Sequence, residues 1–180
     1  MTTPADRDNG SELPLLRGYP ADLLRQVRLL LAEDGVPGYL ARRYPERHEI
    51  RSDKALYAHV DRWRQSHLRH APRIDRVRYD NTLDVIEQAL GQHVRRTRVQ
   101  GGRLQVHREI RIASLFKEAA SGFLDMIVVH ELAHLKVMDH DRSFYQLCEH
   151  MLPSYAQREF DFRLQLTWER WQKRQNATVA

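Results

Sequence analysis

The sequence predicts an α+β fold: N-terminal helices, a small and mostly antiparallel sheet, a buried apolar helix and C-terminal helices, in that order. Three observations carry this prediction. Apolar residues recur at helical spacing near both ends of the chain. Between them, apolar residues alternate with arginines, as in half-buried strands. A mainly apolar run from Phe123 to Val129, with no helix breaker after Gly122, then precedes a histidine-rich segment, which indicates a buried helix.

The length of 180 residues fits a single globular domain with a helical extension. We expect a disordered tail over residues 1–17, which are polar and mixed in charge, and a helical region over residues 18–72. Residues 73–180 are expected to hold the functional site and to form one compact unit with the helical region. Cys148 is the single cysteine, so no internal disulfide can form, and its apolar surroundings predict a small core residue.

The chain carries neither a secretory leader nor an apolar run of 18 residues, so we expect a cytoplasmic protein with no membrane partner. The N-terminal helices are expected at residues 21–32 and 39–43, separated by the breaker Gly35-Val36-Pro37-Gly38. Ser52 or Asp53 can begin a longer helix that ends near His70, before Pro72.

Strands are expected at residues 73–79, 94–99, 104–107 and 109–116, and the pair Gly101-Gly102 predicts a hairpin turn. Thr82 to Gly91 is ambiguous and favours a short helix. Beyond the histidine-rich segment, Asp141 or Ser143 can cap a helix that runs to Met151 and is stopped by Pro153. Ser154 and Gln157 have the spacing of a capping box, which predicts a last helix from about Tyr155 to Trp171.

A metal-binding motif lies on a helix that we expect from about Gly122 to Lys136. The motif is His130-Glu131-Leu132-Ala133-His134. Residues i and i+4 share one helix face, so His130 and His134 can direct their imidazoles to one metal ion at about 2.0–2.1 Å. Glu131 lies about 100° further round the helix, where it can act as a general base on a metal-bound water without being a ligand.

His140 is a candidate third ligand, provided that the chain leaves the helix and turns back, a turn that Asp139 and Asp141 favour. Three protein ligands leave a fourth position open, as catalytic zinc sites require. The sequence therefore predicts one Zn²⁺ per chain. The alternative is a chance occurrence of the motif in a buried helix whose two histidines are satisfied by ordinary hydrogen bonds.

Positive charge is concentrated in one segment. The formal net charge is +5, and residues 91–111 hold six arginines against a single acid, Glu109. Such a segment can bind nucleic acid. The alternative is a solvated surface, which the lack of interleaved aromatic residues favours.

The segment from about Arg108 to Tyr155 resembles the YgjP-like metallopeptidases, which stand with the SprT-like and Wss1-like groups among the gluzincins. The resemblance lies in the motif His130 to His134, in His140, and in the pairs Phe144-Tyr145 and Pro153 with Tyr155. It implies a zincin-like fold, zinc ligands at His130, His134 and His140, and Glu131 as catalytic acid/base. Residues 98–102 depart from the Trp-Gly-Ser-Cys segment of many members. Val137 stands where metzincins place glycine, which argues against a metzincin turn.

The main hypothesis is a zinc metallopeptidase, a hydrolase acting on protein or peptide substrates. One alternative is a metal-dependent nucleoside triphosphate pyrophosphatase or phosphohydrolase, an activity proposed within the resembling family, and another is a zinc-stabilised nucleic-acid- or protein-binding module. A purely structural zinc site does not need Glu131. Candidates for a group that supports a ligand or stabilises an oxyanion are Tyr145, His150 and Tyr155.

Overall fold

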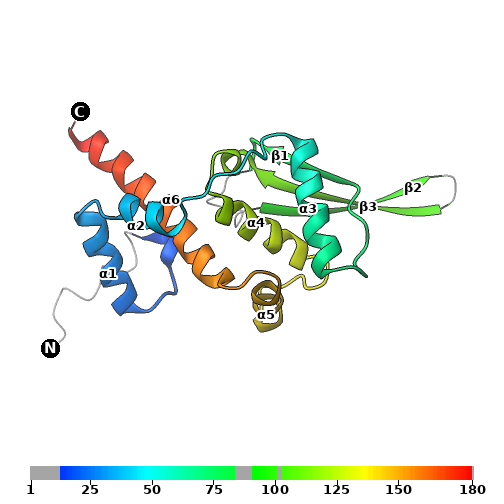
Figure 1. Cartoon of the computed structure of the whole chain (residues 1–180), viewed down its shortest axis with the longest axis horizontal. Helices are drawn as coiled ribbons and strands as arrows, with labels where there is room; N and C mark the ends of the chain where they lie inside the picture. Colours follow the sequence, from blue (N-terminus) through cyan, green and yellow to red (C-terminus); the bar gives the residue numbers. More distant parts are fainter. Residues whose placement is uncertain (1–12, 84–90, 101–102, 180) are drawn as a thin grey trace. The chain divides into compact units, whose positions relative to one another are not determined.

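The computed structural model describes residues 13–83, 91–100 and 103–179. These residues divide between two compact units, Met1–Pro45 with Glu159–Ala180, and Glu46–Arg158. The junction between the helical region 18–72 and residues 73–180 lies inside the second unit, where α3 (Asp53–His67) packs on β1 (Arg76–Asp80) (Figure 1). The expectation that these two regions form one compact unit stays a prediction.

The unit Glu46–Arg158 contains a three-stranded sheet in the order β1-β3-β2, with β2 at Gly91–Gln100 and β3 at Arg103–Ala113. β2 and β3 are antiparallel, but β1 runs parallel to β3. The expectation of a mostly antiparallel sheet is therefore corrected to a mixed sheet. Local alternation of apolar and polar residues predicts that a segment is a strand, but it contains no information on which neighbour the strand pairs with.

The core of this unit lies on one face of the sheet. The side chains of Val77, Tyr79, Ile110 and Ile112 are buried, and they alternate along β1 and β3 with charged residues. The helix α4 (Ser121–Ala133) packs against β2 and β3 and also contacts α3 (Figure 1). Because α4 is apolar on all sides and buried along almost its whole length, the residues at its end are held in a fixed place.

A short 3₁₀ helix, η3 (Ser114–Lys117), joins β3 to α4, and α5 (Arg142–Met151) follows α4. The strand expected over residues 109–116 therefore ends at Ala113. Cys148 in α5 is fully buried, which confirms it as a core residue. The short helix expected between Thr82 and Gly91 and the hairpin turn at Gly101-Gly102 fall on residues 84–90 and 101–102, outside the described part of the chain.

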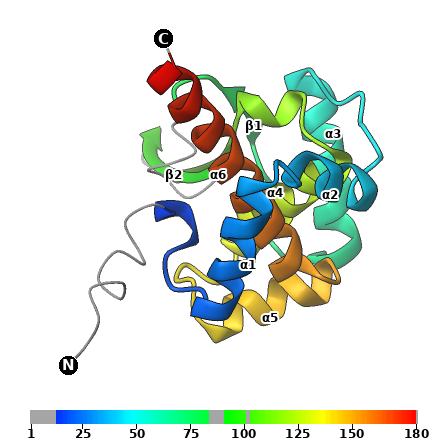
Figure 2. The ribbon, with the colours of Figure 1, turned by 90° about the vertical axis from the view of Figure 1, so that its left-hand side faces the viewer.

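The unit Met1–Pro45 with Glu159–Ala180 is helical. The 3₁₀ helix η2 (Pro14–Leu16), α1 (Ala21–Ala32) and α2 (Val36–Arg43) pack against the later part of α6 (Tyr155–Val179) (Figure 2). Leu13 and Leu16 belong to this core, so the end of the segment expected to be a disordered tail is packed.

A buried carboxylate joins α2 to α6 within the helical unit. Asp161 is fully buried and accepts hydrogen bonds from the hydroxyls of Tyr39 at 3.0 Å and Tyr44 at 2.7 Å. The Arg43 guanidinium lies 3.1 Å from the same carboxylate. These contacts supply the charge and hydrogen bonds that a buried carboxylate requires.

The start of α3 confirms an expected cap, since the Ser52 hydroxyl accepts a hydrogen bond from the Ala55 amide. At the start of α6, Ser154 has a φ of +64°, and the Ala156 amide donates to the Glu149 carboxylate. The capping box expected between Ser154 and Gln157 stays a prediction. In the part of the chain described, no helix has the length and apolar character needed to cross a membrane.

Candidate metal centre

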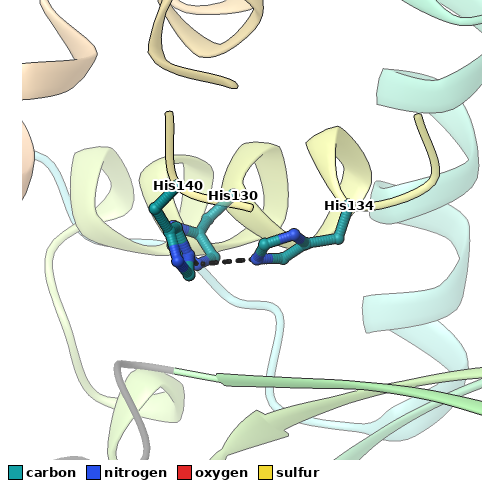
Figure 3. A group of neighbouring side chains, drawn as sticks. All are labelled: His130, His134 and His140. Atoms are coloured by element: carbon teal, nitrogen blue, oxygen red, sulfur yellow. Dashed lines mark hydrogen bonds between the residues drawn. The ribbon is translucent and has the colours of Figure 1, made fainter. Parts of the chain in front are cut away.

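Three imidazoles converge at the end of α4. The Nε2 atom of His130 lies 3.3 Å from that of His134 and 3.1 Å from that of His140. One ligand atom from each histidine can be chosen so that all three lie within 4.8 Å of one another. Figure 3 shows His130 and His134 extending from the end of α4 and His140 from the segment that follows. The structure thus brings together the three residues that the sequence predicts as ligands.

The spacing of these nitrogen atoms fits a single cation. Two nitrogens that each lie about 2.05 Å from a tetrahedral zinc ion are about 3.3 Å apart, close to the observed separations. Three imidazole lone pairs facing one another at this distance require either a shared proton or a cation to compensate them. Residues of this type and arrangement are suited to hold one metal ion.

The tautomer of His134 is set by its own loop. Its Nδ1 lies 3.0 Å from the Val137 carbonyl oxygen, which can only accept, so Nδ1 carries the proton and Nε2 keeps its lone pair. Burial lowers the pKa of His134, which favours the neutral imidazole that a metal ion binds. This contact was not predicted from the sequence.

The helix ends earlier than expected, and this brings His140 back to the site. α4 ends at Ala133 with His134 as its C-cap, and not at Lys136. A tight turn follows, in which the amides of Lys136 and Val137 both donate to the Ala133 carbonyl. His134 nevertheless keeps a helical backbone conformation, so the i and i+4 geometry of the two helical ligands is preserved.

Asp141 begins the next helix and fixes the residue before it. Its carboxylate accepts hydrogen bonds from the Ser143 and Phe144 amides at 2.8 and 3.0 Å. The Ser143 hydroxyl donates to the same carboxylate at 2.6 Å, and this bond, together with the two amide bonds, lowers the pKa of Asp141. The amide bonds confirm Asp141 as the predicted N-cap of α5. Because His140 directly precedes this cap, the start of α5 positions the third imidazole.

Phe144 packs against all three histidines. Its ring centroid lies 5.0 Å from that of His130, 4.7 Å from that of His134 and 4.7 Å from that of His140, and the side chain is fully buried. This contact with the histidines was not predicted from the sequence. The signal that could have suggested it is the position of Phe144, four residues after the third histidine and in the first turn of a capped helix.

Glu131 is buried beside these ligands. Its side chain is 1% exposed, and its Oε2 atom has no hydrogen-bond partner among the described residues. Burial raises the pKa of Glu131 to about 8. A cation held by the histidines would favour the ionised form. A buried carboxylate with an open oxygen is suited to exchange a proton with a water molecule at the metal.

The three further candidates differ in their placement. Tyr155 is fully buried, and its hydroxyl lies 2.7 Å from Nδ1 of His130. Tyr145 is 37% exposed, and its ring contacts that of Phe144 at 5.4 Å. His150 is exposed in the last turn of α5 and is not part of the histidine group.

The side chains of most of the arginine-rich segment fall on residues 91–106, outside the described part, so nucleic-acid binding there stays a prediction. Three of its charged residues, Arg108, Glu109 and Arg111, have described side chains. Arg111 pairs with Asp80, and Arg78 pairs with Glu109 at 2.8 Å. The charges of Glu109 and Arg111 are therefore used in pairing between strands.

Comparisons with known proteins give a matching family model and a similar named protein. Residues 9–163 match the family model described as YgjP-like, metallopeptidase domain. A protein named UTP pyrophosphatase, from Escherichia coli (strain K12), is 51% identical over 157 residues, which cover 87% of this chain and 94% of that protein. No solved structure matches significantly.

Proposed function

Because the chain belongs to the YgjP-like metallopeptidase family, we propose that it is a zinc-dependent hydrolase whose substrates are nucleoside triphosphates. The observation that carries this choice is the 51% identity, over nearly the full length of both chains, to the protein named UTP pyrophosphatase. Nucleoside triphosphate hydrolysis, which was an alternative on sequence grounds, therefore becomes the leading proposal, and UTP is the first substrate to test.

In this proposal His130, His134 and His140 hold the ion. When bound there, a zinc ion would supply Lewis acidity, which lowers the pKa of a coordinated water to about 7. Glu131 accepts a proton from the attacking water, and its buried Oε2 atom is the acceptor. Water attacks the α-phosphorus, and the bond from that atom to the oxygen that bridges the α- and β-phosphates breaks. Pyrophosphate leaves as the anion, the nucleoside monophosphate keeps the oxygen of the water, and Glu131 then releases its proton to solvent.

The second candidate is peptide-bond hydrolysis. It is supported by the arrangement of His130, Glu131 and His134 at the end of one helix and by the description of the matching family model. Glu131 would accept the proton of water as before and then return it to the leaving amine, a step that the phosphoanhydride reaction does not need.

Parallel assays on the purified protein test these proposals. The protein is stripped with a chelator, reloaded with zinc and incubated either with UTP or with a denatured protein. We expect zinc-dependent release of pyrophosphate from UTP, and loss of this release on chelation and in Glu131→Gln. Cleavage of the denatured protein without hydrolysis of UTP would favour the peptidase. Bound zinc with neither reaction would favour the binding module.

A further inference from the structure

We propose that Tyr155 is a positioning residue that fixes the imidazole of His130 for metal binding, an inference that rests on the proposed metal centre. The Tyr155 hydroxyl lies 2.7 Å from Nδ1 of His130, and the two rings are nearly parallel, with an interplanar angle of 24°. Tyr155 is fully buried and His130 is only 4% exposed. Water therefore has little access to replace this hydrogen bond.

The placement of protons gives the contact its role. The Nε2 atom of His130 faces the Nε2 atoms of His134 and His140, so it is the nitrogen that can bind the ion. Nε2 can bind only if the ring proton is on Nδ1, where the Tyr155 oxygen accepts it. The hydroxyl therefore stabilises the binding tautomer and restricts rotation of the ring. Groups that hold a metal-binding histidine in this way commonly change metal affinity about 10–100-fold when removed.

The turn between α5 and α6 places Tyr155. Leu152 is the C-cap of α5, and its carbonyl accepts a hydrogen bond from the Tyr155 amide at 3.1 Å. Ser154 between them adopts a φ of +64°, which reverses the chain direction within a short segment. The Glu149 carboxylate then accepts the Ala156 amide at 2.8 Å and secures the start of α6.

His130 and His134 are oriented by different kinds of group. His134 donates to the Val137 carbonyl, three residues along the chain, so its orientation is set within its own loop. His130 depends on a side chain 25 residues away. The segment from α5 to α6 therefore contributes two groups to the site, the ring of Phe144 that packs on the histidines and the hydroxyl of Tyr155 that orients one of them.

Tyr155→Phe tests the proposal, because it keeps the ring and removes only the hydroxyl. The zinc dissociation constant is measured by competition with a chromogenic chelator, and the melting temperature is measured with and without zinc. The matched control is Tyr79→Phe in the same unit: Tyr79 is also buried, and its hydroxyl donates to the Ile50 carbonyl at 2.6 Å, away from the histidines.

We expect Tyr155→Phe to weaken zinc binding about 10–100-fold while Tyr79→Phe leaves it unchanged. NMR of the zinc-loaded, ¹⁵N-histidine-labelled protein should show a protected Nδ1 proton on His130 that is lost in Tyr155→Phe. That spectrum is recorded at saturating zinc, so the test also works if the variant is less stable.

Two results would overturn the role of Tyr155 and leave the metal centre intact. One is a zinc dissociation constant that is unchanged in Tyr155→Phe. The other is equal weakening of zinc binding in Tyr155→Phe and Tyr79→Phe, which would reflect a general loss of stability. A wild-type protein that binds no zinc would instead overturn the metal centre, and the role of Tyr155 with it. The wild-type measurement thus separates failure of the proposed function from failure of this inference.

Discussion

The two halves of the candidate metal centre are built differently. His130 and Glu131 lie on α4, 4% and 1% exposed, in a helix packed on all sides. His140 is exposed on a short segment between two helices, held by the cap at Asp141 and by contact with Phe144. The buried half is therefore placed by the core, whereas the exposed half is placed by a few local hydrogen bonds and one ring.

The comparison also indicates a division of roles. A residue fixed by the core keeps its position whether or not the ion is bound. A ligand on a short exposed segment is more easily displaced, because fewer contacts oppose its movement. We therefore expect the helix half to determine the chemistry and the loop half to determine how readily the ion enters and leaves.

The largest expected effect comes from removing a ligand of either half. His130→Ala and His140→Ala should each weaken zinc binding by more than the 10–100-fold that is typical of losing a supporting contact. His140→Ala should mainly speed zinc release, whereas His130→Ala should also lower stability because it leaves a cavity beside Phe144. Chelator competition and stopped-flow release measure these effects. Unchanged zinc binding in His140→Ala would remove it from the ligand set.

Glu131→Gln tests whether the buried half also carries the reaction. The change keeps the size of the side chain but removes its ability to accept a proton, so kcat should fall about 10²–10⁴-fold while one zinc ion per chain is retained. Activity is measured with UTP and zinc by elemental analysis. Activity within a few-fold of wild type would exclude Glu131 as the general base.

Glu131 should give the buried half a pH-dependent stability. In the metal-free protein burial raises the pKa of Glu131 to about 8, so the folded form holds a proton that the unfolded form has lost above about pH 4.5. The stabilisation is fully present below pH 4.5 and is lost as the pH rises to about 8, a change of up to about 5 kcal/mol. Urea unfolding at several pH values should show this slope in the metal-free wild type and a smaller slope in Glu131→Gln. An equal dependence of stability on pH in the two proteins would contradict a raised pKa at Glu131.

Phe144→Ala tests the contact that joins the two halves. Loss of a buried phenylalanine costs about 3–5 kcal/mol, and here it should also weaken zinc binding, because the ring supports all three histidines. Phe144→Leu is the matched variant that keeps most of the apolar volume. Thermal unfolding and zinc titration of both variants provide the measurement. A variant that loses stability but binds zinc normally would limit Phe144 to the core.

The smallest expected effect comes from the cap of the exposed half. Asp141→Ala removes the acceptor of the Ser143 and Phe144 amides, so His140 should be less well placed and zinc affinity should fall modestly. Ser52→Ala removes the cap of α3, which costs about 1 kcal/mol of stability and should not change zinc affinity. Equal zinc affinity in Asp141→Ala and wild type would show that the cap does not position His140.

What could be predicted from the sequence was local in the chain. The spacing of His130 and His134 fixes their geometry on any helix, and Asp141 caps a helix through amides two and three residues away. The contact of Tyr155 with His130 and the packing of Phe144 depend on tertiary structure. The parallel pairing of β1 with β3 was not predictable either, since the alternation pattern of a strand does not identify its neighbour. The early end of α4 follows from a turn whose hydrogen bonds are specific to this loop.

X-ray absorption spectroscopy at the zinc edge, on protein of measured metal content, determines whether the three histidines bind one zinc ion. We predict one zinc ion per chain with three imidazole nitrogens at about 2.0–2.1 Å and a further light-atom ligand at the open position. The assignment of His130, His134 and His140 as the metal ligands would be contradicted by either of two results. One is a reloaded protein that holds less than one zinc ion per chain, and the other is a spectrum with fewer than three imidazoles.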